Sequence, residues 1–247
     1  METTSQLIDF LEKYKNLNLE LNEKKIYSKK ETFNQLIKGY ESITSTINAF
    51  EKQIATNYNI FGLLKNIYKD ETRTHSPFLA DLLNVNGEHK QSDLFYSEFL
   101  RILGFEENLS FIPTIPCLQK VELEKVTGTG NIDILISYFD KEKRFAIAIE
   151  NKIYALDQPK QLERYYLHLN SLYDKFLLVY LTPNGRLPSI PYSMDKQIYE
   201  DLTRDRKLIL MSYEKGISSL IENTMNKIKA QKVQQIVSQY LEIIKSL

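Results

Sequence analysis

The stretch RFAIAIENK, residues 144–152, decides how the middle of this 247-residue chain is interpreted. Its apolar run, rich in residues that favour extended structure, predicts a β-strand buried in the centre of a sheet. Side chains alternate along a strand, so Glu150 and Lys152 share one face while Asn151 points to the other. Two unlike charges at the end of a buried strand form either a covered salt bridge or part of a functional site.

The neighbouring segments predict further strands. VELEKV (121–126), NIDILISYF (131–139) and KFLLVYLTP (175–183) are short, rich in β-branched or aromatic residues and bounded by turn residues. Between the third and fourth strands, DQPKQLERYYLHLNSLY (157–173) has the apolar spacing of a helix. The order is therefore strand, strand, strand, helix, strand, which indicates an α/β fold class.

Helical segments are expected on both sides of this α/β core. One apolar stripe repeats with a 4-3 spacing at Leu36, Tyr40, Ile43, Ile47, Phe50 and Ile54. A second stripe of the same kind comprises Val233, Val237, Tyr240, Ile244 and Leu247. We expect residues 1–56 to form a helical extension and residues 57–247 to form the main domain. The first stripe is expected to pack on the chain's own core; a hairpin with the Leu7–Leu21 segment and a dimer contact are the alternatives.

The composition is that of a globular protein. Hydrophobic residues make up 43% and charged residues 26% of the chain, which argues against long disordered tracts. With a single cysteine, Cys117, and no apolar run of membrane-spanning length, we expect a soluble cytoplasmic protein without a membrane partner. Lysine plus arginine equals aspartate plus glutamate at 32 each, which counts modestly against binding of nucleic acid.

A second acid accompanies Glu150. If the two strands that contain Asp133 and Glu150 form a hairpin turning at residues 141–142, the two acids lie opposite each other, with β-carbons about 5 Å apart. Carboxylates at this separation repel each other unless a positive charge lies between them. A divalent cation is the usual solution, and oxygen ligands favour Mg²⁺ or Mn²⁺ over zinc. A salt bridge from Glu150 to Lys152 is the structural alternative, but it leaves Asp133 as a second acid in a crowded place.

Asp133 followed by Glu150-Asn151-Lys152 resembles the motif of the PD-(D/E)xK nuclease superfamily, whose members have a restriction-endonuclease-like fold. Ile132 stands where many members carry proline. Gln161 and Tyr165 lie four residues apart on one helical face and resemble the Q-x-x-x-Y element of exonuclease-like members. The resemblance implies a central mixed β-sheet flanked by helices within residues 57–247.

An upstream segment extends this resemblance. NIFGLLKNIYKDETRTHSPFLADLLN, residues 59–84, resembles the helical motif of a bacterial branch in which an acid ahead of a His-Ser pair joins the site. Here these residues are Glu71, His75 and Ser76. The resemblance spans roughly residues 57–185.

The resemblance also implies roles for individual residues. The catalytic residues would be Glu71, Asp133, Glu150 and Lys152. Asp133, Glu150 and the backbone carbonyl of Asn151 would hold one Mg²⁺ or Mn²⁺, and Lys152 would orient the attacking water. The expected substrate contacts are His75, Ser76, Gln161 and Tyr165. For Tyr165 a place in the apolar helix face is an equally good expectation, because buried tyrosines are common in cores.

The function implied by the resemblance is metal-dependent hydrolysis of phosphodiester bonds, with DNA as the expected substrate and defence against foreign DNA as the setting by analogy. A second hypothesis is a catalytically silent nuclease fold that binds nucleic acid or protein. Such a module is expected to lack one of the active-site residues, and here Asp133, Glu150 and Lys152 are all present. A homodimer through the helical stripes is compatible with either function.

Overall fold

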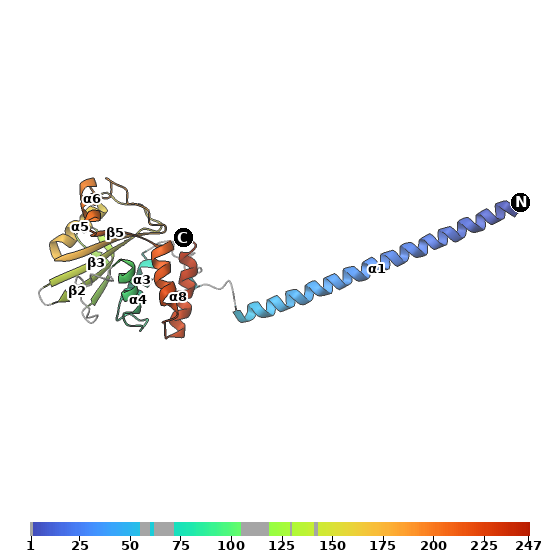
Figure 1. The fold of residues 1–247 in the computed structure, drawn as a ribbon, viewed down its shortest axis with the longest axis horizontal. Helices are drawn as coiled ribbons and strands as arrows, with labels where there is room; N and C mark the ends of the chain where they lie inside the picture. The colour runs from blue at the N-terminus through green and yellow to red at the C-terminus, as the bar shows by residue number, and fades with distance from the viewer. Residues whose placement is uncertain (1, 55–59, 62–71, 105–118, 129, 141–142) are drawn as a thin grey trace. The chain divides into compact units, whose positions relative to one another are not determined.

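A computed structural model describes residues 2–54, 60–61, 72–104, 119–128, 130–140 and 143–247 (Figure 1). The chain divides into two compact units, Met1–Tyr58 and Asn59–Leu247, which are described separately. Among the described residues, none of the helices combines the length and the apolar character needed to cross a membrane.

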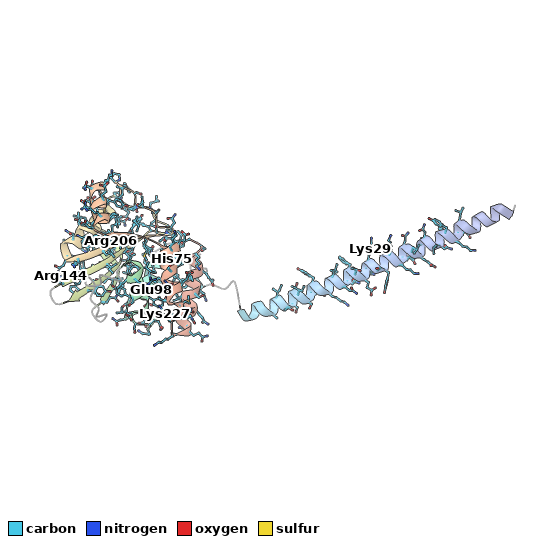
Figure 2. The ribbon with its side chains drawn as sticks, in the orientation of Figure 1. Lys29, His75, Glu98, Arg144, Arg206 and Lys227 are labelled. Atoms are coloured by element: carbon cyan, nitrogen blue, oxygen red, sulfur yellow. The ribbon has the colours of Figure 1, made fainter. Side chains whose placement is uncertain are left out.

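The described part of the first unit is one continuous α-helix, α1 (Glu2–Ile54). The predicted hairpin is therefore wrong, and the reason is that no glycine or proline interrupts the helical sequence between residues 21 and 36. Within this unit the described side chains of the apolar stripe are exposed, with Tyr40 at 72% and Ile43 at 61%. The expected packing of this stripe on the chain's own core stays a prediction. Figure 2 shows side chains, Lys29 among them, projecting from the middle part of this helix.

The second unit is built on a five-stranded mixed sheet. Its strands are β1 (Gln119–Val126), β2 (Asn131–Asp140), β3 (Lys143–Asn151), β4 (Lys175–Thr182) and β5 (Leu208–Ser212). They lie side by side in this order; β1, β2 and β3 are antiparallel, whereas β4 is parallel to both β3 and β5. The helix α5 (Gln161–Leu172) connects β3 to β4, as a parallel pair requires. The predicted α/β class and mixed sheet are confirmed, and β5 is an additional strand that was not predicted.

The pairing of β2 with β3 has the predicted register. Ile134 pairs with Ile149, and Asp140 pairs with Lys143, so the reversal falls at residues 141–142, which lie outside the described residues. Continued by one position, the same register brings Asp133 opposite Glu150.

Helices cover both faces of the sheet (Figure 1). On one face lie α3 (His75–Leu83), α4 (Leu94–Ile102), α7 (Ser218–Met225) and α8 (Gln231–Ile244), and on the other lie α5 and α6 (Lys196–Arg204). In β3, Ile147 and Ile149 pack toward α3, and Ala146 and Ala148 pack toward α5. Each large apolar side chain buried in this way contributes about 1.5–3 kcal/mol, so the core holds the end of β3 firmly in place.

Candidate functional site

A cavity of about 380 Å³ opens where β2 begins and β3 ends. Six residues that the sequence predicts for the site contribute to its wall: Asp133, Glu150, Asn151, Lys152, Gln161 and Tyr165. The wall also contains residues without a predicted role: Thr72, Glu124, Gly130, Asn131, Ala155 and Gln158. The fold thus gathers side chains from three strands and one helix at a single depression.

Glu150 and Lys152 form a buried ion pair in this wall, with 2.7 Å between Lys152 Nζ and Glu150 Oε1. Glu150 is 1% exposed, and burial together with the nearby Asp133 raises its pKa to about 8. Its second oxygen, Oε2, is buried and has no hydrogen-bond partner among the described residues. A structural salt bridge would satisfy both carboxylate oxygens, so this arrangement leaves one acceptor for a further group.

Asp133 is held beside the end of β3 by a backbone hydrogen bond. The amide N–H of Asn151 donates to Asp133 Oδ2, with 2.6 Å between the two atoms. The next amide, that of Lys152, donates to the carbonyl of Leu181 on β4 at 2.8 Å. In a trans peptide the C=O points opposite to the N–H, so the Asn151 carbonyl is directed back toward β2, where Asp133 lies.

These groups fit the predicted metal in their chemistry. Asp133, Glu150 and the Asn151 carbonyl offer only oxygen atoms, which suit Mg²⁺ or Mn²⁺. In the part of the chain that the structure describes, no group of three His, Cys, Asp or Glu side chains is arranged to hold a metal ion. A ligand set here would therefore combine two carboxylates with the backbone carbonyl and water.

The opposite face of β3 is closed by a buried polar network. The Asn151 side chain donates through Nδ2 to Ser76 Oγ at 3.0 Å and accepts at Oδ1 from the Tyr213 hydroxyl at 3.2 Å. Tyr213 begins a π-helical turn (Tyr213–Ile217) that leads from β5 into α7. His75, labelled in Figure 2, lies where α3 meets α8, with 3.0 Å between its Nδ1 and the Tyr240 hydroxyl.

This placement differs from the predicted contacts of His75 and Ser76 with substrate. The two side chains are 2% and 0% exposed, and neither lines the cavity. The physical reason is that the first turn of α3 packs against the Asn151 face of the sheet, while the cavity lies on the Glu150 face.

Gln161 and Tyr165 connect α5 to the start of β2. The Gln161 side-chain amide donates to the Tyr165 hydroxyl oxygen at 3.1 Å, and that hydroxyl donates to the carbonyl of Asn131. Tyr165 also packs with Leu162 and Leu169, so its ring belongs to the core while its hydroxyl reaches the cavity. Burial raises the pKa of Tyr165, which keeps the phenol a neutral donor.

Four residues relevant to the site were either not predicted from the sequence or are not described by the structure. Glu71 falls outside the described residues, and its catalytic role stays a prediction. No local sequence pattern indicates Tyr213 or Tyr240, because they lie near the site only through the packing of distant helical segments. Glu124 was detectable in principle, since aligning VELEKV against NIDIL places it opposite Asp133.

The chain belongs to the PD-(D/E)XK nuclease superfamily, because the model of that family matches residues 58–242. No curated protein sequence matches the chain. Among solved structures, the Acinetobacter baumannii Cap4 SAVED/CARF-domain containing receptor is similar at 16% identity, with a TM-score of 0.32 over 60% of this chain and 41% of that chain. The DNA modification-dependent restriction endonuclease AspBHI is similar at 14% identity, with a TM-score of 0.29 over 63% of this chain and 40% of that chain. The chain thus spans about two fifths of each of these two structures.

Proposed function

We propose that this chain is a metal-dependent nuclease that hydrolyses phosphodiester bonds of nucleic acid, with DNA as its substrate. The observation that supports this most strongly is the cavity wall, where Asp133, Glu150 and Lys152 are all present and a buried oxygen of Glu150 has no hydrogen-bond partner among the described residues. Membership of the nuclease superfamily agrees with this chemistry.

Asp133, Glu150 and the carbonyl of Asn151 would hold Mg²⁺ or Mn²⁺. Such an ion polarises a phosphate group and lowers the pKa of its bound water. Lys152 places a positive charge within the same cavity, where it would orient the attacking water and stabilise negative charge that develops on the phosphate. The Asn151 amide, by binding Asp133, would keep the two acids at a fixed separation.

His75 and Ser76 are proposed to position the site rather than to touch nucleic acid. Ser76 binds the Asn151 side chain directly, and His75 contacts Tyr240 beside it. Gln161 and Tyr165 would hold the start of β2 in a comparable way and border the substrate. Glu71 is proposed as a further acid of the site, on the resemblance alone.

The exposed apolar stripe of α1 is proposed as the contact of a homodimer. Its side chains, such as Ile43 and Ile47, are more than half exposed, and a stripe with this spacing is typical of paired helices. Mass measurement in solution tests this: we expect a dimer for the full chain and a monomer for the double variant Ile43→Lys, Ile47→Lys. A wild-type monomer would contradict it.

Defence against foreign DNA is proposed as the setting, by analogy with the superfamily.

The decisive test is degradation of plasmid, linear double-stranded and single-stranded DNA, and of RNA, in Mg²⁺, in Mn²⁺ and in EDTA. We expect metal-dependent loss of DNA, and a decrease in rate of about 10²-fold or more for Lys152→Ala. Lys143→Ala is the matched control, because Lys143 lies on the same strand but is exposed and remote from the cavity wall. Circular dichroism confirms that both variants fold. If the wild-type protein degrades no nucleic acid in either metal, the proposal fails and a binding module is favoured.

A further inference from the structure

Three neighbouring strands each place one acidic residue at matching positions of the sheet: Glu124 on β1, Asp133 on β2 and Glu150 on β3. In the ladder between β1 and β2, the residues on both sides of Glu124 pair with the residues on both sides of Asp133. Glu124 therefore stands at the position opposite Asp133. The register of β2 with β3 brings Glu150 to the other side of Asp133. The three acids form one row across β1, β2 and β3.

Glu124 departs from the extended conformation at this position. Its φ is 47°, in the left-handed region that residues other than glycine rarely adopt, and pairing resumes at Lys125 without a change of register. Residues held in sparsely populated backbone regions persist only where the surrounding structure imposes them, and they cluster at active sites and ligand-binding positions. Glu124 lines the same cavity as Asp133 and Glu150.

Acidic side chains outnumber basic ones in the cavity wall. Among the described residues of the wall, the three acids and Lys152 are the charged side chains. Lys152 is engaged with Glu150 Oε1 at 2.7 Å, whereas Glu150 Oε2 has no hydrogen-bond partner in the described part of the chain. This buried oxygen is a separate sign that the cavity takes a cation.

We infer that Glu124 is a third acidic residue of the metal site, on the side of Asp133 that faces away from Glu150. No three acidic side chains among the described residues converge directly on one point. Mg²⁺ retains several of its waters in protein sites, so Glu124 would accept hydrogen bonds from water on the ion. The inference rests on the proposed function and adds a residue that lies outside the superfamily motif.

Calorimetric titration of the metal-free full chain with Mn²⁺ alone tests this, without substrate. We expect Glu124→Gln to weaken Mn²⁺ binding by about 10-fold or more, the range seen when groups supporting a metal site are removed. Glu122→Gln is the matched control: it removes the same charge from the same strand, but Glu122 pairs with Lys120 and Lys125 and does not line the cavity. It should bind Mn²⁺ as the wild type does.

A second variant of Glu124 keeps the inference testable if Glu124→Gln does not fold. Glu124→Asn removes the carboxylate and tolerates the left-handed backbone, so it should lose the same affinity. A second readout is the rise in melting temperature on adding Mn²⁺, which should be smaller for both Glu124 variants than for Glu122→Gln. If the wild type binds Mn²⁺ and cleaves DNA while the folded Glu124 variants bind equally well, the inference is overturned and the proposed function stands. If the wild type binds no Mn²⁺ and cleaves nothing, both are overturned.

Discussion

The two faces at the end of β3 differ in whether their polar side chains have all their hydrogen-bond partners. Toward α5, Glu150 and Lys152 form an ion pair that leaves one carboxylate oxygen without a hydrogen-bond partner among the described residues. Toward α3, the Asn151 side chain uses its donor on Ser76 and its acceptor on Tyr213. The face toward α5 is thus incomplete among the described residues, whereas the face toward α3 is completed by the protein's own side chains. Under the proposed function, the incomplete face would carry the chemistry and the completed face would support it.

The largest effect is expected from the incomplete face. Asp133→Asn and Glu150→Gln keep the shape of each side chain but remove the charge that would hold a cation, so we expect metal-dependent DNA cleavage to fall by about 10³-fold. Single-turnover cleavage of labelled DNA measures this. Glu200→Gln, an exposed acid of α6, is the control and should retain full activity. Normal cleavage by either site variant would break the assignment of chemistry to this face.

The same face should also control stability in the absence of metal. Burial and Asp133 raise the pKa of Glu150 to about 8, so the folded protein keeps a proton that the unfolded chain releases near pH 4.5. The free energy of unfolding should therefore be highest at low pH within this window and decrease by a few kcal/mol between about pH 4.5 and 8. Urea unfolding in EDTA at several pH values measures it. Glu150→Gln should lose this dependence, and an unchanged slope in that variant would show that another group is responsible.

A smaller effect is expected from the completed face. Tyr213→Phe removes the hydroxyl that donates to Asn151 and leaves a buried acceptor, which costs about 1–3 kcal/mol of stability. Since Asn151 also positions Asp133, we expect kcat to fall by roughly 10-fold while KM changes little. Tyr166→Phe, on α5 outside the cavity wall, is the control. A loss of stability without any change in kcat would mean that this face supports the fold but not the chemistry.

The sequence predicted the part of the site that depends on strand pairing. Apolar alternation and hairpin symmetry fix the register, and the observed pairing of Ile134 with Ile149 confirms it. The sequence did not predict β5, because a five-residue apolar run does not distinguish a strand from a buried helical segment. Tyr213 was missed because it reaches Asn151 across 62 residues of sequence, a contact that only tertiary folding creates.

The two apolar stripes show the same limit. Both have the 4-3 spacing, and both form helices as predicted. In α8, Val237, Tyr240 and Ile244 are buried, whereas Tyr40 and Ile43 of α1 are exposed. Periodicity predicts that a helix has an apolar face, but the neighbour of that face is decided by the rest of the fold.

The dependence of Asn151 on Tyr213 has a consequence for biosynthesis. All three strands that carry the acids, together with their connecting turns, leave the ribosome before Tyr213 is added. Until that tyrosine is in place, the Asn151 side chain lacks the hydroxyl from which its Oδ1 accepts, and the amide that binds Asp133 belongs to this same residue. Under the proposed function, a nascent polypeptide of this protein would thus reach its full nuclease activity only when the segment that begins at Tyr213 has folded.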